Sequence, residues 1–428
     1  MPPNLSPRSG NPVAAASQGD GDICSHILVI MERLSQIKDI HTLLDEVLFQ
    51  ARRLTQADAG SFYLIENGVL NFKYLHNDSL FGPEGGKKYL YTSKTLPIDH
   101  LSLAGYVALT GQPLIIDDVY NIPPDMPFRF YDVFDRLSGY HTKSVLAVPL
   151  ITSTHNTVGV LQIINPLSPD GKPAAFTDQN RLLLSYFAGN AAAAIERAMM
   201  TREIILRMIM MCELRDPKET GMHASRVGAY AAEVYHQWSL NRGLPEDEIK
   251  RMKDHLRVAA MLHDLGKVAI SDLILKKPDR LTTAEFRAMQ YHTIMGARLF
   301  RHRETDLDAL SAEIALTHHE KWDGTGYPGK IADINQEQPP IGVGKRGEEI
   351  PLAGRIVSLA DVYDALVSQR VYKEPWSEQN ALDYIQEQSG KHFDPEVVDA
   401  FLAIYEVITA IREKYQEDSN LPDLVDPD

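Results

Sequence analysis

Residues 255–270 read HLRVAAMLHDLGKVAI, and this stretch decides what kind of domain the second half of the chain can form. It predicts a largely apolar helix, yet His263, Asp264 and Lys267 are set among the apolar residues. Burying an imidazole, a carboxylate and an ammonium group together costs free energy unless each finds a partner. Metal ions are the most economical common partner, because they bind neutral imidazole and carboxylate. We therefore expect a helical domain built around a metal site.

A second motif places two histidines side by side. Residues 316–330 read LTHHEKWDGTGYPGK, in which His318 and His319 close a helix. Adjacent helical side chains project about 100° apart, because one turn holds ~3.6 residues. Both can therefore reach one ion only off the end or edge of the helix. The chain must then turn sharply, and Gly324 and Gly326 allow that turn.

Other candidate ligands lie on separate helical segments of the same half. Glu219 and His223 are spaced i, i+4, so they face the same way on a helix. His292 lies within an amphipathic helix, and Asp361 follows an apolar run that favours its burial. The set mixes nitrogen and oxygen donors and contains no cysteine. These donors suit iron or manganese, with zinc, nickel or cobalt also possible.

The two halves of the chain predict different fold classes. In the first half, one hairpin turns at Asn67-Gly68 and a second turns around residues 152–156. With a helical run from Ile23 to Ala57, these hairpins predict an α+β domain around an antiparallel sheet. From Asp216 to about Glu417 only helical periods are found, which predicts an all-α domain.

Capping residues predict several helix boundaries. Threonine, serine and aspartate are typical of helix starts, and glycine is typical of helix ends. The predicted starts are at Thr282, Ser377 and Asp394, and the predicted ends are at Gly111 and Gly390.

A long helix is expected where the two halves meet. It begins near Asp178, and its connecting part covers residues 182–215. Arg202 interrupts a seam of apolar residues at three- and four-residue spacing, which consists of Ile195, Ala198, Ile205, Ile209 and Cys212. This face either packs on its own domain or forms a parallel dimer seam. We favour a homodimer through the first domain and this helix, because the helix is longer than either domain needs for its own packing.

Length and composition exclude several classes of protein. A chain of 428 residues is too long for one ordinary core. Its net charge of −15 makes binding to nucleic acid polymers unexpected. Without an apolar run of ~18 residues we expect no membrane span, and the two cysteines favour a reducing cytoplasm. Residues 1–22 are typical of a disordered leader, and residues 413–428 of an acidic tail.

The motifs of the second half together resemble the HD-GYP family, a branch of the HD-domain metal-dependent phosphohydrolases. They are LHDLGK, HHEKWDGTGYP, ADVYDAL and RVYKEPWS, within residues 210–412. Members of that family hydrolyse cyclic di-GMP with two or three metal ions, often iron. The resemblance implies an all-α bundle with this activity, which yields pGpG, GMP or both.

The resemblance also implies a set of metal ligands. His263 and Asp264 become the HD ligands, with Asp264 bridging two ions. The ligand set is completed by His223, His292, His318, His319 and Asp361. Family members with a glutamate four residues before the histidine at position 223 can hold a third ion. Because Glu219 occupies that place, we expect three ions, with iron first and manganese next.

Catalytic and substrate-binding residues are implied in the same way. Asp264 and Lys267 are expected to be catalytic, and the ammonium group of Lys267 could bind a phosphate oxygen. Substrate contacts are expected at Lys267, Gly326, Tyr327, Pro328, Arg370 and Lys373. The lip formed by Tyr327 and Pro328 could also bind a GGDEF-domain partner. Residues 329–351 depart from the family by their length, and could fold over the mouth of the site.

Residues 23–200 resemble a GAF domain, because LAGYVALTGQPLIIDDV, SVLAVPLI and GVLQIIN occur in that order. The signature of cyclic-nucleotide-binding members is not intact after Asn165, and no cysteine in the middle of the domain could anchor a bilin. A lone histidine is more often structural than a haem ligand, which applies to His76, His100 and His141. We expect a regulatory sensor or dimerisation domain with an unknown ligand.

Two alternative functions stay open. The substrate could be 3',3'-cyclic GMP-AMP instead of cyclic di-GMP. The second half could also be a receptor or adaptor that binds a cyclic dinucleotide without turnover. The intact ligand set argues against the receptor, since a degenerate binder usually loses ligands.

Overall fold

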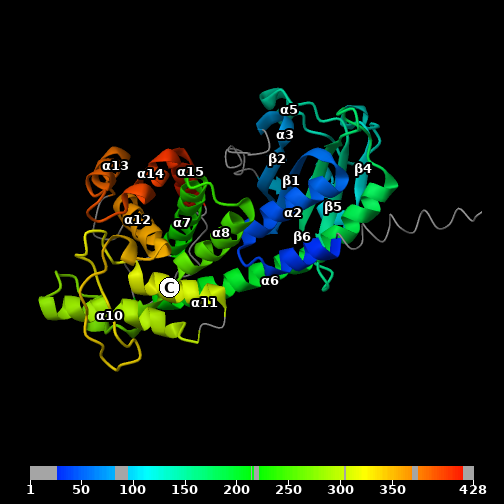
Figure 1. The fold of residues 1–428 in the computed structure, drawn as a ribbon. Helices are drawn as coiled ribbons and strands as arrows, with labels where there is room; N and C mark the ends of the chain where they lie inside the picture. Colours follow the sequence, from blue (N-terminus) through cyan, green and yellow to red (C-terminus); the bar gives the residue numbers. More distant parts are fainter. Residues whose placement is uncertain are drawn as a thin grey trace, which may run out of the picture. The chain divides into compact units, whose positions relative to one another are not determined.

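The computed structural model describes residues 27–81, 95–213, 215, 221–302, 305–368 and 375–417 (Figure 1). The chain divides into two compact units. Residues 43–197 form the first unit together with the chain before residue 38, and residues 38–42 join the chain from residue 198 onward in the second. Within the described ranges, no helix is both long and apolar enough to cross a membrane.

The first unit is built on a six-stranded antiparallel sheet with the order β3-β2-β1-β6-β5-β4. Its strands are β1 (Ala57–Glu66), β2 (Val69–Asn77), β3 (Thr95–Pro97), β4 (Leu114–Ile116), β5 (Val145–Ile151) and β6 (Thr157–Pro166). Both predicted hairpins are confirmed, because β1 pairs with β2 and β5 with β6. Asn67 and Gly68 have φ of 52° and 76°, the left-handed geometry of a two-residue turn.

Helices accompany this sheet in the first unit. They are α2 (Ile40–Thr55), α3 (Asp78–Phe81), α4 (Leu103–Thr110), η2 (Val119–Asn121), α5 (Val133–Ser138) and the first part of α6 (Asp178–Glu213). As predicted, α4 ends at Gly111, whose φ is 65°. Val107 of α4 packs with Val145 and Val160 of the sheet, so the core of the unit lies between them.

The helical run predicted from Ile23 to Ala57 is wrong as one continuous element. Residues 27–36 are helical, residues 37–39 are not, and α2 begins at Ile40. Within the second unit, the carboxylate of Asp254 accepts the backbone N–H groups of Lys38 at 3.1 Å and Asp39 at 2.6 Å. These N–H groups therefore bond to a side chain instead of continuing a helix.

The second unit is helical, and its described residues contain no strand, as predicted. After α6 it comprises α7 (Gly221–Asn241), α8 (Glu246–Met261), η3 (Leu265–Ala269), α9 (Asp272–Leu275), α10 (Thr283–Leu299), α11 (Asp306–Thr317), η4 (Gly347–Glu349), α12 (Leu352–Val367), α13 (Glu378–Glu387), α14 (Pro395–Ala403) and α15 (Tyr405–Glu417). Its core packs α7, α12 and α14 through the buried rings of Tyr230, Tyr363 and Phe401.

The predicted starts of α10, α13 and α14 are confirmed, since Thr282, Ser377 and Asp394 each cap a helix through the side chain. The predicted end at Gly390 is wrong, because α13 stops at Glu387 and Gln388 is its C-cap. The predicted leader (1–22) lies outside the described residues. Of the predicted acidic tail (413–428), the described part belongs to α15.

The seam predicted on α6 packs inside the chain. Ile195 is fully buried, and Ala198, Ile205 and Ile209 are at most 9% exposed. Ile205 and Ile209 pack with Leu265 of η3. These four side chains therefore pack within the chain, and dimerisation stays a prediction.

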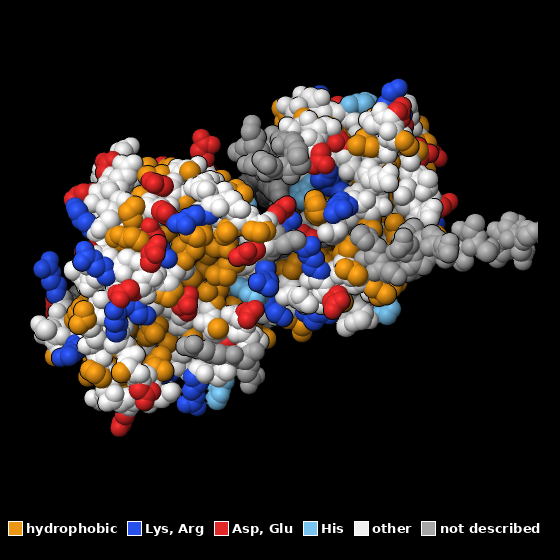
Figure 2. Space-filling model, viewed as in Figure 1, with side chains coloured by type: hydrophobic (Ala, Val, Ile, Leu, Met, Phe, Trp, Pro, Cys, Tyr) orange, Lys and Arg blue, Asp and Glu red, His pale blue; other side chains and the backbone are white. Residues whose placement is uncertain are grey.

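Figure 2 shows acidic and basic side chains interspersed over the visible face of each unit. Nucleic acid polymers require a continuous basic patch or stripe, which this pattern does not provide on that face.

Candidate metal centre

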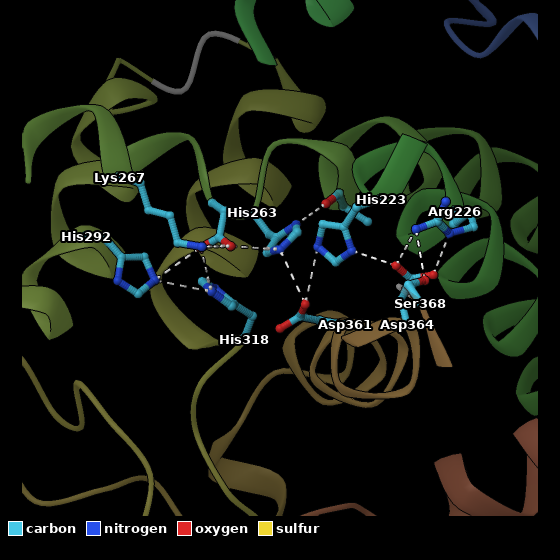
Figure 3. A network of polar contacts seen from close by, with 11 residues as sticks. His223, Arg226, His263, Lys267, His292, His318, Asp361, Asp364 and Ser368 are labelled. Atoms are coloured by element: carbon cyan, nitrogen blue, oxygen red, sulfur yellow. Dashed lines mark hydrogen bonds and ion pairs between the residues drawn. The ribbon is translucent and has the colours of Figure 1, made fainter. Parts of the chain in front are cut away.

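The predicted ligands that the structure describes converge at one place in the second unit (Figure 3). They come from α7, the turn between α8 and η3, α10, the end of α11, and α12. They are His223, His263, Asp264, His292, His318, His319 and Asp361. Helices that are far apart in the sequence are thus needed to build this one site.

The helix predicted over residues 255–270 ends earlier than expected. α8 stops at Met261, and His263 and Asp264 lie in the turn before η3. A Cβ atom on Gly266 would lie 2.0 Å from the carbonyl oxygen of His292, so η3 approaches the backbone of α10 at this glycine. The turn therefore carries Asp264 toward His292, which a continuous helix would not do.

The donor atoms form two groups. Asp264, His292, His318 and His319 make up the first, and His223, His263 and Asp361 make up the second. Within each group, one donor atom from every residue lies within 4.8 Å of the others. Adjacent histidines at the end of α11 thus share one group, which is the arrangement expected from their position at a helix end.

Asp264 contributes to both groups through its two carboxylate oxygens. Oδ1 lies 3.3 Å from Nε2 of His292 and 3.5 Å from Nε2 of His318. Oδ2 lies 3.3 Å from Nε2 of His263. The second group closes through Asp361, whose Oδ1 lies 3.9 Å from Nε2 of His263 and 3.4 Å from Nε2 of His223. One carboxylate placed between two donor groups is the geometry of a bridging ligand.

Hydrogen bonds orient several of the imidazole rings. Nδ1 of His263 lies 2.8 Å from the carbonyl oxygen of Ala260, and Nδ1 of His292 lies 2.7 Å from that of Met289. Nδ1 of His318 lies 3.0 Å from the Ile314 carbonyl oxygen. A carbonyl oxygen can only accept, so each Nδ1 carries the proton and each Nε2 keeps its lone pair toward the centre.

The electrostatics of the site favour ionised carboxylates but act differently on the imidazoles. Burial opposes the charged form of His263, but the carboxylate of Asp264 outweighs burial and raises the pKa of that imidazole. Burial lowers the pKa of His318 and of His319. Burial alone would raise the pKa of Asp264, but Lys267, whose Nζ lies 2.8 Å from Oδ2, and His263 hold that pKa well below its usual range. Burial likewise opposes ionisation of Asp361, but the neighbouring imidazoles of His223 and His263 outweigh burial and lower the pKa.

These donors fit a metal cluster. Nε2 of His263 and Oδ1 of Asp264 are buried, and no described residue gives either atom a hydrogen bond. The Nε2 atoms of His292 and His318 face each other at 3.5 Å, and a lone pair on each would repel the other without a cation near them. Asp361, which was expected to be buried, keeps 15% of its side-chain exposure.

A loop that begins at Glu320 forms the predicted lip beside the first group. The ring of Tyr327 stacks on His319 with centroids 4.8 Å apart, and a cis peptide bond joins Tyr327 to Pro328. Burial raises the pKa of Tyr327, so its hydroxyl stays protonated. A Cβ on Gly326 would lie 2.3 Å from the backbone nitrogen of Lys321, so only glycine fits this turn.

Residues 329–351 follow this lip, and hydrogen bonds to Glu320 hold them at Gly329 and at Lys345. The buried carboxylate of Glu320 accepts the backbone N–H of Gly329 at 2.6 Å and that of Lys345 at 3.0 Å. The segment between them rests on α10, where Tyr291 donates to the carbonyl of Pro339 at 2.9 Å. The longer loop thus packs beside the helix that carries His292.

Three predicted site residues, Glu219, Arg370 and Lys373, lie outside the described residues. Sequence reasoning missed Asp364, which contacts the ligand His223, and Glu320, which holds the loop beside the first group. The i, i+3 spacing of Asp364 from Asp361 places both on one face of the helix and is the signal that could have found it. Glu320 was passed over, although it directly follows the histidine pair.

Comparisons with known proteins agree with this arrangement. Residues 39–195 match the GAF domain family, and residues 207–397 match the HD domain family. A cyclic di-GMP phosphodiesterase of Vibrio cholerae is 40% identical over 226 residues, which cover 51% of this chain and 42% of that protein. The 3'3'-cGAMP-specific phosphodiesterase 2 of Vibrio cholerae is 36% identical over 223 residues, which cover 52% of this chain and 37% of that protein. The chain thus spans less than half the length of these two relatives.

Among solved structures, the GAF domain of an Acinetobacter phosphoenolpyruvate-protein phosphotransferase aligns with a TM-score of 0.32 and 16% identity, covering 42% of this chain and 97% of that one. The predicted resemblances to a GAF domain and to an HD-type hydrolase are confirmed by the family matches. An HD domain implies binding of divalent metal ions. Along this chain, a match to the GAF domain family is thus followed by a match to the HD domain family.

Proposed function

We propose that the second unit hydrolyses a 3',5' phosphodiester bond of a cyclic dinucleotide, with cyclic di-GMP as the first candidate. The observation that carries this proposal is the placement of Asp264 between two groups of imidazole and carboxylate donors. Two-metal sites are typical of phosphodiester hydrolysis, because the attacking and the leaving oxygen are both stabilised. The names of the relatives from Vibrio cholerae support the same class of substrate.

The two donor groups would each hold one divalent ion, with Asp264 shared between them. Bound there, the ions would lower the pKa of a water molecule and polarise the phosphate oxygens. Nitrogen and oxygen donors without sulfur favour iron first and manganese next. The proposal of a third ion rests on Glu219, four residues before His223 in the sequence.

The side chains of the site have separate tasks in this reaction. Lys267, only 16% exposed, points its ammonium group at the carboxylate of Asp264 and is placed to hold a non-bridging phosphate oxygen. The lip at Tyr327 and Pro328 offers an aromatic surface for a guanine base, to which Arg370 and Lys373 would add cationic contacts. One water is consumed: its oxygen bonds to phosphorus, the bond to the ribose oxygen breaks, and that oxygen leaves as a hydroxyl group.

The product is linear pGpG after one cleavage and GMP after two. A second candidate substrate is 3'3'-cGAMP, which the name of one relative favours. Both dinucleotides present the same ribose–phosphate linkage and differ in one base.

Protein purified without oxygen tests the proposal. Metal content is measured, and the protein is incubated with each dinucleotide while the products are resolved by chromatography. We expect hydrolysis by the wild type and none by the variant that carries His263→Ala with Asp264→Ala. His302→Ala, at an exposed histidine outside both donor groups, is the control that should keep full activity. Binding of a dinucleotide without turnover by metal-loaded wild type would favour a receptor instead.

The first unit is proposed to regulate the second through a ligand of its GAF domain. His76 bonds to Asp45 at 2.7 Å and His141 stacks on Tyr120, so each has a protein partner that supports a structural role. A homodimer through the GAF domain and α6 is proposed as well, with exposed Met200 and Ile204 as the contact, since the buried seam is not available. Light scattering of the full chain tests it. The lip at Tyr327 remains a proposed contact for a GGDEF-domain partner.

A further inference from the structure

The histidine on α7 is held differently from the other oriented ligands. Nδ1 of His223 lies 2.7 Å from Oδ2 of Asp364, a carboxylate that is completely buried on α12 (Figure 3). His263, His292 and His318 instead direct Nδ1 at backbone carbonyl oxygens. Among the described ligand histidines whose Nδ1 partner is defined, His223 alone therefore faces a charged side chain.

The carboxylate of Asp364 is itself fixed by an arginine. Nε of Arg226 donates to Oδ1 at 2.6 Å, and Nη2 donates to Oδ2 at 2.8 Å and to the hydroxyl of Ser368 at 3.0 Å. Such a two-pronged contact sets both the position and the plane of the carboxylate. Because the pair is buried and its charges cancel, Asp364 is held as an acceptor behind His223.

This arrangement determines which nitrogen of His223 carries the proton. An ionised carboxylate can only accept a hydrogen bond, so Nδ1 must be the protonated nitrogen. Nε2 then keeps its lone pair on the side of Asp361, whose Oδ1 lies 3.4 Å away. A ligating histidine oriented by a carboxylate is also a stronger donor to a metal ion.

The second donor group depends on this orientation more than the first. It contains His223, His263 and Asp361, whereas the first contains three histidines in addition to Asp264. The second group thus has two imidazoles and the first has three, so loss of one imidazole removes half of the imidazoles of the second group.

We propose that Asp364, held by Arg226, is a positioning residue that keeps His223 in the metal-binding tautomer and so determines whether the second ion position is filled. The inference rests on the metal centre of the proposed function and adds a residue that does not touch the ion or the substrate.

Asp364→Asn is the direct test, because asparagine differs from aspartate at one atom. Three donors converge on the two oxygens of Asp364, and asparagine offers a single oxygen to them. If the amide NH2 faces His223, Nδ1 must accept and the ring proton moves to Nε2, where it blocks ligation. If the amide NH2 faces Arg226 instead, it points at the N–H groups of the guanidinium, and neither donor has an acceptor in this buried place.

Metal content after dialysis against a weak chelator is the first readout. We expect Asp364→Asn to lose about one ion per chain, since changes in such oriented partners typically weaken metal binding roughly 10–100-fold. The matched control is Asp394→Asn, which alters another buried aspartate that pairs with an arginine, Arg355. Asp394 contacts no ligand of either donor group, and its variant should keep the wild-type metal content.

The ring nitrogens of His223 in the metal-free protein give a second readout, which does not depend on catalysis. Nitrogen NMR should show a protonated Nδ1 in the wild type, and a shift toward protonated Nε2 in Asp364→Asn. Should this variant fold poorly, Arg226→Met combined with Asp364→Leu removes both charges together and leaves no buried charge alone. It is expected to lose the same ion.

The outcomes separate this inference from the proposed function. A folded Asp364→Asn chain with wild-type metal content and an unchanged His223 tautomer would overturn the positioning role, even if hydrolysis were confirmed. A wild-type chain that binds its ions but hydrolyses neither dinucleotide would overturn the proposed function and leave the role of Asp364 standing. A wild-type chain that binds no ion would overturn both.

Discussion

Gly266 offers a demanding test of how the centre is assembled. A Cβ atom at this position would lie 2.0 Å from the carbonyl oxygen of His292 and 2.4 Å from the backbone nitrogen of Gly296. Ordinary contact begins near 3.4 Å, so Gly266→Ala must move η3 and α10 apart by about 1.4 Å, the difference between 3.4 and 2.0. Both obstacles are backbone atoms, which cannot rotate away as a side chain would.

Two effects of known size follow from that separation. Overpacking of this kind typically lowers the free energy of unfolding by about 1–3 kcal/mol. The same movement carries Asp264 away from His292, whose contact is now 3.3 Å. A misplacement of about 1 Å can reduce a catalytic rate roughly 100-fold. We therefore expect Gly266→Ala to be less stable and to hydrolyse cyclic dinucleotide far more slowly.

Urea denaturation of the metal-free protein measures the loss of stability, and metal content with hydrolysis rate measures the damage to the site. Gly189→Ala on α6 is the matched control, because a Cβ there would meet no atom within 4 Å. That change should leave activity unaltered and raise stability by roughly 0.5–1 kcal/mol, since alanine is the better helix former. A Gly266→Ala protein with wild-type stability and rate would refute the close packing of η3 on α10.

Three further predictions concern single side chains of the second unit. Glu320→Gln should lower the free energy of unfolding by about 1–3 kcal/mol, because the buried carboxylate that accepts two backbone N–H groups loses one of its oxygens. Thermal unfolding measures this loss. The control is Glu349→Gln at an exposed position, which should have little effect. Burial raises the pKa of Asp254 to about 7, so the folded state binds the proton more tightly than the unfolded state. Stability should therefore fall as the pH rises from about 4 to about 7, by at most about 1.4 kcal/mol per pH unit, and Asp254→Asn should flatten this dependence in urea titrations. Tyr327→Phe keeps the aromatic ring that stacks on His319 and should leave the KM for cyclic di-GMP nearly unchanged. Tyr327→Ala removes the ring and should raise the KM. Equal KM values for the two variants would count against the lip as a substrate contact.

Local sequence signals predicted the elements of the fold well where one residue settles a backbone choice. Asn67-Gly68 specifies a tight hairpin, and Thr282 specifies a helix start, because their side chains or backbone freedom act within a few residues. The break after residue 36 could not be read in this way. It depends on Asp254, more than 200 positions away, which accepts N–H groups of the segment.

The same division between local sequence signals and contacts of distant residues applies to the metal centre. The adjacent histidines and the HD dipeptide were recognisable as motifs, and the resemblance supplied the rest of the ligand set. That α8 ends before His263 was not predicted, because the cause is the approach of Gly266 to α10 and not the local sequence. The role of Asp364 was hidden for a similar reason, since Arg226 and His223 approach it from another helix.

The two hydrogen bonds that Glu320 accepts from Gly329 and Lys345 have a practical consequence for protein engineering. One carboxylate fastens the chain at Gly329 and at Lys345, so both points stay fixed when the length of the exposed part between them changes. We therefore expect an epitope or fluorescent label inserted after exposed Glu337 to be tolerated.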